Sequence, residues 1–337
     1  MTFSGNDGQK RLGLVLAFGT LVWSGTYNAL AKGLMPFLSP ITLLLLSEAL
    51  TAIFIIVTFG LVPLLKKMVK LDNASIRMAI IVGLINSAIA PLLWFTGLSY
   101  TTAVNATMLS SAEMVWVLIL SHYLLSERLN RMQMTGMMIV IMGVIIVNVS
   151  ALNEGTGVNT GDILILLGCI ASGTGAVLFK KYLSHVMPEL AILIRNIAGI
   201  IAVGFVSMIF SQSVSAEVAA FPMQQVLLLL AFTFFSRYLN LVFFYEALDR
   251  LPATTLSLIQ IANPFTGVLF AFLILGEHIE SYHVLGGIFI IFGLMLEQTS
   301  QKSFSSMKGR GLVHIPFLHR SPKIIAQQTI PILPPNI

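Results

Sequence analysis

Apolar stretches of membrane-spanning length recur along most of the sequence, and this feature limits the fold more than any other. A helix needs about 20 apolar residues to cross a bilayer. An open sheet would leave unpaired amides in lipid, and the sequence lacks the alternation typical of barrel strands. We therefore expect an all-α integral membrane protein with ten transmembrane helices. The predicted spans are 11–33, 40–64, 78–98, 102–125, 132–150, 161–180, 189–210, 222–248, 252–275 and 282–297.

The amino-acid composition supports this class. Hydrophobic residues make up 56% of the chain and charged residues only 10%, whereas a soluble domain carries roughly 25% charge. These values exclude a disordered chain, a nucleic-acid module and an ordinary soluble enzyme. The single cysteine, Cys169, excludes a disulfide framework and a thiolate metal cluster.

Basic residues are divided unevenly between the two sets of connections, and this division predicts the topology. One set holds eleven Lys or Arg, and the other set holds none. Because cytoplasmic loops carry the excess of Lys and Arg, we expect both termini to be cytoplasmic, in a multi-pass protein of a bacterial inner (plasma) membrane. The eleven residues are Lys10, Arg11, Lys66, Lys67, Lys70, Arg77, Arg128, Arg131, Lys180, Lys181 and Arg250.

The chain also contains an internal repeat. A shift of 150 residues places Leu125-Ser126-Glu127 on Leu275-Gly276-Glu277, and the glycines at 136 and 143 on those at 286 and 293. A shift of 148 places Ser24-Gly25-Thr26 on Ser172-Gly173-Thr174. The spans occur in the same order in both halves, so the sequence predicts two five-span repeats.

Because five is odd, the second repeat must be inserted upside down relative to the first. The connection 65–77 is basic, while its counterpart 211–221 has no Lys or Arg. Inverted repeats are typical of secondary carriers, which hold the substrate near the bilayer midplane. The predicted organisation is a cytoplasmic N-terminus (1–10), the first repeat (11–150), an external connection (151–160), the second repeat (161–297) and a basic, disordered cytoplasmic tail (298–337).

The doubled pattern resembles the EamA type of the drug/metabolite transporter superfamily. A glutamate ends the fourth span of each repeat, and glycines at helical spacing follow it in the fifth. This resemblance implies a ten-helix carrier that exports small metabolites, amino acids or drugs. Further matches are Trp23-Ser24, Pro188 followed by Arg195, and Pro264, whereas Ser47 and Met114 occupy the slots equivalent to Arg195 and Pro264.

Ionisable residues inside spans identify candidate site residues, because each costs about 3 kcal/mol at a helix centre. Glu113 lies midway along the fourth span, and Ser110 precedes it on the same helix face. The equivalent residues of the ninth span are Asn263 and Gln260. We expect these two polar stripes to bind a polar substrate, although hydrogen bonds that merely join helices are an alternative. The ionisable residues within spans are Glu48, Glu113, Arg195, Arg237 and Glu246.

Arg237 lies near the middle of the eighth span, with Asn240 on the same face. Its guanidinium can bind a carboxylate or phosphate. The alternative is an ion pair with Glu113 or Glu48. Aromatic residues of this span, and Trp94 in the equivalent part of the third, can either stack on a substrate or face lipid.

A polar stripe follows one face of the first span and is interpreted as the lining of the pathway or the seam between repeats. It consists of Thr20, Ser24, Asn28 and Lys32, of which Lys32 is interpreted as an interfacial anchor. Glu127 and Glu277 are expected to accept hydrogen bonds from amides that start the following helix. The complete candidate substrate-binding set is Glu113, Arg237, Asn263, Gln260, Ser110, Asn240, Glu48, Arg195, Asn28, Ser24 and Trp94.

These observations favour a secondary transporter that exports a small molecule by alternating access. A channel or a non-transporting membrane scaffold is the alternative, followed by a membrane enzyme, for which common catalytic motifs are lacking. We expect no cofactor, metal or nucleic acid. The expected partners are a small-molecule substrate, membrane lipid and, if Glu113 or Glu48 titrates, a proton as coupling ion.

Overall fold

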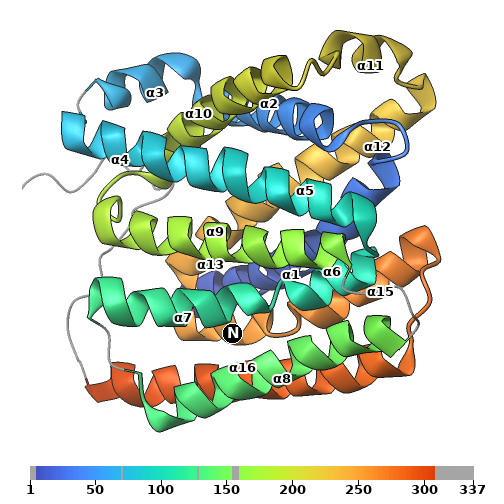
Figure 1. The fold of residues 1–337 in the computed structure, drawn as a ribbon. Coiled ribbons are helices and arrows are strands. Elements are labelled where there is room, and N and C mark those ends of the chain that lie inside the picture. The colour runs from blue at the N-terminus through green and yellow to red at the C-terminus, as the bar shows by residue number, and fades with distance from the viewer. Residues whose placement is uncertain (1–4, 70, 127–128, 154–158, 308–337) are drawn as a thin grey trace, which may run out of the picture.

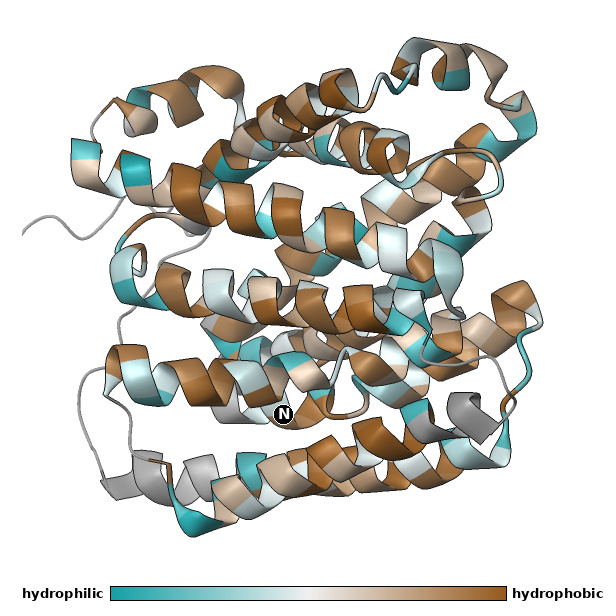
Figure 2. Ribbon diagram, viewed as in Figure 1, coloured by the Kyte–Doolittle hydropathy of each residue, from teal (hydrophilic) through white to brown (hydrophobic). Residues whose placement is uncertain are grey.

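The computed structural model describes residues 5–69, 71–126, 129–153 and 159–307, and within these ranges the secondary structure is helical with no strand (Figure 1). Ten helices in the described residues are long and apolar enough to cross a membrane. This confirms the predicted all-α membrane fold with ten spans. Hydrophobic residues, coloured brown, occur along the helices of the bundle (Figure 2), and Val57, Met208 and Leu227 are each more than three quarters exposed, as lipid-facing residues are.

The first repeat begins with two long helices and ends with another. Its third span consists of three helical segments and its fourth of two. The elements are α1 (Gly5–Leu34), α2 (Pro40–Phe59), the short α3 (Leu61–Met68), α4 (Asn73–Leu84), η1 (Ile85–Ile89), α5 (Ala90–Tyr100), α6 (Ala103–Leu109), α7 (Ala112–Leu125) and α8 (Arg131–Asn153).

The second repeat follows the same order, with a short helix again after its second span. Its last helix runs on past the predicted end of the repeat at 297. The elements are α9 (Thr160–Tyr182), α10 (Pro188–Ile209), α11 (Val214–Ala220), η2 (Met223–Gln225), α12 (Val226–Ala231), η3 (Phe232–Leu239), α13 (Asn240–Arg250), α14 (Ala253–Gln260), α15 (Asn263–Leu275) and α16 (Ser281–Met307).

The second span is shorter than the predicted range 40–64. It starts where the Ser39 side chain accepts a hydrogen bond from the backbone N–H of Thr42, with Pro40 in the first turn. It ends at Gly60, whose φ of 78° lies in the region that only glycine adopts without strain. The chain therefore leaves the second span at Gly60 and begins α3 in a new direction.

Equivalent irregularities occur in the two repeats. The fourth and ninth spans are each broken into two helices, at 110–111 and at 261–262. The third and eighth spans each contain a π-helical segment, η1 and η3, at positions related by the repeat. π-Helices are rare and occur frequently at functional sites. Because both repeats keep these breaks, they belong to the shared architecture rather than to one half.

The two repeats are interleaved in space. The first helix, α1, packs against η3, α13 and α15 of the second repeat, and α9 packs against α5, α7 and η1 of the first. Figure 1 shows α9 lying between α5 and α7. Each repeat therefore contributes its first span to the other half of the bundle.

The fifth and tenth spans, α8 and α16, lie side by side at one edge of the bundle (Figure 1). A Cβ atom on Gly136 would come within 2.6 Å of the Gly293 carbonyl oxygen, and one on Gly143 within 2.8 Å of the Gly286 oxygen. The glycines of the doubled sequence pattern thus allow two backbones to touch, as small residues do between membrane helices.

Candidate functional site

Two hydrogen bonds related by the repeat lie at the broken spans. The Ser24 hydroxyl of α1 donates to Asn263 Oδ1 of α15 over 2.7 Å. The Ser172 hydroxyl of α9 donates to Glu113 Oε1 of α7 over 2.8 Å. Ser24 and Ser172 are equivalent, as are Asn263 and Glu113. The sequence-predicted residues Ser24, Asn263 and Glu113 are therefore brought into one repeated arrangement, with Ser172 as the member that the candidate set lacked.

The helix breaks set the position of these side chains. Glu113 lies in the first turn of α7, and Asn263 is the first residue of α15. Backbone N–H groups at the start of a helix have no partner within it and favour negative or oxygen-bearing groups. The breaks place a carboxylate and an amide in the first turns of two helices within the bundle, where the Glu113 N–H itself donates to the Ser110 carbonyl over 3.1 Å.

Glycines let the serine-bearing helices come close to the broken ones. A Cβ on Gly25 would lie 2.7 Å from the Thr266 hydroxyl, and one on Gly173 would lie 3.3 Å from the Trp116 ring. Gly25 and Gly173 are equivalent, and so are Thr266 and Trp116. The close approach of α1 to α15 therefore has its counterpart in the approach of α9 to α7.

A second cluster joins three spans nearer to the predicted external end. The Trp94 indole N–H donates to Asn28 Oδ1 over 2.9 Å, and Asn28 Nδ2 donates to the Thr107 hydroxyl over 2.9 Å. Asn28 is buried, with 7% of its surface exposed. The tryptophan ring is held in place by the amide, so Trp94, Asn28 and Thr107 form one packed unit, called here the external cluster.

Arg237 pairs with Glu48, and not with Glu113, the other partner that the sequence analysis left open. Its guanidinium also donates to the Ser47 hydroxyl over 2.7 Å. Asn196, with its amide nitrogen turned toward Glu48, donates to Glu48 Oε2 over 3.0 Å. Glu48 is only 1% exposed, and a buried carboxylate is tolerated when it is paired and hydrogen-bonded in this way.

Four other candidate residues are not joined to these groups in the described part of the chain. The Ser110 hydroxyl donates to the carbonyl of Thr107 in its own span, over 2.5 Å. Buried polar atoms of the other three, Arg195 Nε, Gln260 Nε2 and Asn240 Oδ1, have no hydrogen-bond partner among the described residues. The predicted stripe of Ser110 and Glu113 is therefore divided, because the helix break falls between them.

Polar contacts also connect the predicted external ends of the spans. Lys32 Nζ donates to the carbonyls of Leu98 (2.7 Å) and Ser99 (3.2 Å) in the last turn of α5, where a cation is favoured. Glu277 accepts hydrogen bonds from the amides of Ala103 and Val104, each over 2.9 Å. These bonds tie the first span to the third and the ninth to the fourth.

The contact of Glu277 corrects the sequence-based expectation. Glu277 does accept amide hydrogen bonds, but it accepts them at the start of α6 in the first repeat and not at the start of the following helix, α16. The chain leaves α15 through Gly276, whose φ is 67°, and this turn precedes the carboxylate that reaches the other repeat. Glu127, the equivalent residue, lies outside the described residues.

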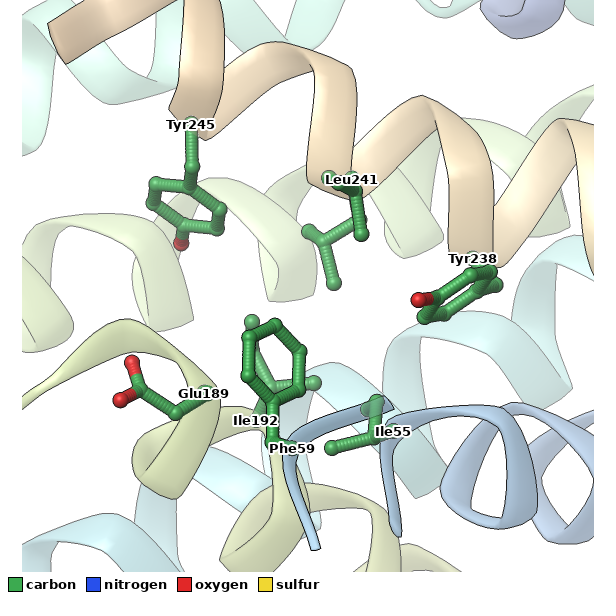
Figure 3. Close-up of a pocket in the computed structure, with 8 residues that line it drawn as sticks. Ile55, Phe59, Glu189, Ile192, Tyr238, Leu241 and Tyr245 are labelled. Atoms are coloured by element: carbon green, nitrogen blue, oxygen red, sulfur yellow. The ribbon is translucent and has the colours of Figure 1, made fainter. Parts of the chain in front are cut away.

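Two pockets among the described residues differ greatly in size. One lies where Tyr238, Leu241 and Tyr245 project toward Phe59 and Ile192 (Figure 3). Its volume is about 10 Å³, which is at the lower limit for one water molecule. The other has a volume of about 250 Å³, which is enough room for a small organic molecule.

Comparison with known proteins gives consistent results. The profile of the EamA-like transporter family matches residues 11–149 and 159–297. A protein of Methanothermobacter thermautotrophicus described as an uncharacterized transporter is 25% identical over 221 residues, which cover 64% of this chain and 63% of that protein. The uncharacterized transporter YyaM of Bacillus subtilis is 23% identical over 83% of this chain and 92% of its own length.

A solved crystal structure has the same fold. It aligns with a TM-score of 0.59 and 14% sequence identity, over 86% of this chain and 97% of the other. At this level of identity the alignment supports the helical arrangement alone.

Proposed function

Because the chain belongs to the EamA-like transporter family, we propose that it is a secondary transporter that exports a small molecule by alternating access. The proposed central site lies at the two helix breaks. Glu113 and Asn263 contact the substrate there, and Ser172 and Ser24 hold their side chains in place. Export, rather than import, is the direction implied by the family resemblance.

The observation that supports this proposal is the repeated pair of hydrogen bonds, Ser24 with Asn263 and Ser172 with Glu113. Discontinuous helices at equivalent positions of two inverted repeats are typical of carrier sites near the membrane midplane. A scaffold has no need to interrupt two of its spans at matching places. The proposal therefore rests on the pairing of breaks and polar side chains rather than on any single residue.

The two pairs differ in charge, and we assign them different roles. Glu113 can bind and release a proton, whereas Asn263 cannot, so Glu113 is the proposed proton carrier. Arg237 is already neutralised by Glu48 and bonded to Ser47. Binding of an anionic substrate would require Arg237 to exchange that partner, so we assign Arg237 to the structural ion pair.

Counterflow in proteoliposomes tests the function. Vesicles containing the purified protein are loaded with one compound from a panel of amino acids, nucleobases, sugar phosphates and cationic drugs, and uptake of the labelled compound is measured. A carrier shows saturable uptake that is accelerated by substrate inside the vesicles. Conduction without this acceleration would identify a channel, and covalent conversion of the compound would identify an enzyme.

The role of Glu113 is tested in the same vesicles. Glu113→Gln should abolish uptake driven by a pH gradient while substrate exchange continues, because exchange requires no net proton movement. Glu280→Gln, a change at an exposed carboxylate, serves as the control and should leave both activities intact. Normal pH-driven uptake by a folded Glu113→Gln variant would remove Glu113 from the proton pathway.

A further inference from the structure

The larger pocket lies between α7, α13, α14 and α16, toward the predicted cytoplasmic end of the bundle. Its volume is about 250 Å³, and every residue that lines it is neutral. The walls are mostly apolar and include Met114, Phe244 and Leu248. Polar groups come from Ser257, Gln260 and Gln298, of which only Gln260 belongs to the candidate set from the sequence.

Two amide atoms of the lining residues have unused hydrogen-bonding capacity. Gln260 Nε2 and Gln298 Oε1 are buried and have no hydrogen-bond partner among the described residues. Gln298 is 4% exposed. A buried polar atom without a partner is costly, and native structures contain few of them. One of these atoms is a donor and the other an acceptor. Each exposes less than 1 Å², so a rotation of the two side-chain amides toward the pocket lets them complement a ligand that carries both kinds of group.

We propose that this pocket binds a neutral small molecule with an apolar body, which accepts a hydrogen bond from Gln260 and donates one to Gln298. This inference rests on the proposed function, because we take the bound molecule to be the transported substrate. The pocket would hold this substrate before it reaches Glu113 and Asn263. A cavity of about 150 Å³ holds benzene. The larger volume here therefore fits a substituted ring with about ten non-hydrogen atoms.

The surrounding charges argue against an ionic ligand. Arg237 is paired with Glu48, and Arg250 is paired with Glu246. Glu113 precedes Met114 in the chain, but its Oε1 accepts a hydrogen bond from Ser172, and Glu113 is not among the lining residues. An ion moved into this pocket would lose its hydration and gain no opposite charge, which is strongly unfavourable.

Three probes of nearly the same shape test the proposal. Benzamide is neutral and has both a donor and an acceptor, benzoate is its anionic counterpart, and benzamidine is its cationic counterpart. In thermal unfolding of the purified full-length protein, benzamide should raise Tm in a saturable manner. Benzoate and benzamidine at the same concentration should not. Equal stabilisation by an ion, or by toluene, which has no polar group, would overturn the proposal.

Variants locate the binding site. Gln260→Leu and Gln298→Leu should each fold and weaken benzamide binding about five- to tenfold, because each removes one hydrogen bond from the complex. The matched control is Gln224→Leu, at an exposed glutamine away from the pocket. Unchanged benzamide binding in both folded pocket variants would overturn the assignment to this pocket.

A filling variant provides an independent measurement. Ser257→Phe should occupy the pocket and abolish the benzamide effect, while Leu227→Phe, at a residue that is 76% exposed, should leave it unchanged. Counterflow separates this inference from the proposed function. Benzamide binding without counterflow of any compound would contradict the proposed transport function and support the pocket assignment. Counterflow without benzamide binding would support the transport function and contradict the pocket assignment.

Discussion

Two regions related by the repeat differ in how tightly they are packed. In the first, Trp94, Asn28 and Thr107 are joined by hydrogen bonds into the external cluster. The repeat relates Trp94 to Phe244 and Thr107 to Ser257, and both equivalents line the larger pocket. Asn28 has Ala176 as its equivalent. The second region therefore lacks both the indole N–H and the amide that bridge the first.

Because of this difference, side chains joined by hydrogen bonds fill the predicted external end, whereas the equivalent region at the predicted cytoplasmic end contains a pocket. The predicted external end is further secured by Lys32 on the third span and by Glu277 on the fourth. The pocket lies at the opposite end. Under the proposed alternating access, the closed and the open end change places, so we predict that the contacts of the external cluster break during transport.

The largest expected effect concerns which end faces outward. In a Cys169→Ala background, Ser215→Cys should react with a membrane-impermeant thiol reagent added to intact cells, and Lys66→Cys should react only after the membrane is opened. Both positions are exposed, and the reason is the uneven division of Lys and Arg. Reaction of Lys66→Cys in intact cells would reverse the assignment of the closed and hollow ends.

The next prediction tests whether the ion pair of Glu48 with Arg237 stabilises the whole fold rather than one end of the bundle. Arg237→Gln should destabilise the protein by about 3–5 kcal/mol, because it leaves the buried Glu48 carboxylate without its counter-ion. Thermal unfolding and expression of monodisperse protein measure this. The double variant Glu48→Gln/Arg237→Gln should recover most of the loss.

The opposite result would also be informative. A folded Arg237→Gln variant that loses transport, with no recovery in the double variant, would place Arg237 in the binding or gating machinery. Normal transport by the folded single variant would remove Arg237 from the mechanism.

A smaller effect is expected from opening the external cluster. Asn28→Ala removes two hydrogen bonds, each contributing about 1 kcal/mol, and should favour the outward-open state. In the Cys169→Ala background, a cysteine at Ser24 should then react about tenfold faster with the impermeant reagent from outside. The control is Asn148→Ala, whose amide donates to the Val144 carbonyl of its own helix. An unchanged rate would show that the cluster does not restrain opening.

The smallest prediction concerns Glu217 in α11, outside the spans. Partial burial acts to raise the pKa of Glu217, but hydrogen bonds from Ser39, Thr42 and Gln212 outweigh it and hold the pKa below its ordinary value of 4.5. A carboxylate with a lowered pKa stabilises the fold above its ordinary pKa, and the contribution disappears as pH falls through the lowered value.

Glu217→Gln should therefore lower Tm slightly at neutral pH, by less than about 1 kcal/mol in stability, because the group lies near water. The difference from the unsubstituted protein should vanish under acidic conditions. A difference that does not shrink as the pH is lowered would contradict this explanation. Thermal scans at several pH values provide the measurement.

Hydropathy and self-comparison predicted the spans, the repeat and the glycines of α8 and α16, because those features depend on patterns within one helix or between two similar segments. Contacts between repeats were harder to predict. The contact of Glu277 with Ala103 depends on the turn of the chain at Gly276, after α15. The ion pair of Arg237 with Glu48 depends on the orientation of η3 relative to α2. Neither partner lies nearby in the sequence.

The helix breaks could also be predicted only in part from the sequence. Pro264 is a signal for the break before α15, since proline is favoured in the first turn of a helix. The equivalent residue, Met114, gives no such signal, yet α7 also begins after a break. The interruption is therefore imposed by the tertiary arrangement in one repeat and supported locally in the other. The role of Gln298 was likewise missed, because its significance depends on the pocket that it lines.

The interleaving of the two repeats has a consequence for synthesis. Most of the contacts of α1 are with η3, α13 and α15, and this part of its surroundings is not complete until Leu275 has been added to the chain. While more than two hundred further residues are made, the final contacts open to α1 in the first repeat are the smaller ones with α5 and α6. The first helix to be synthesised is thus among the last to complete its packing.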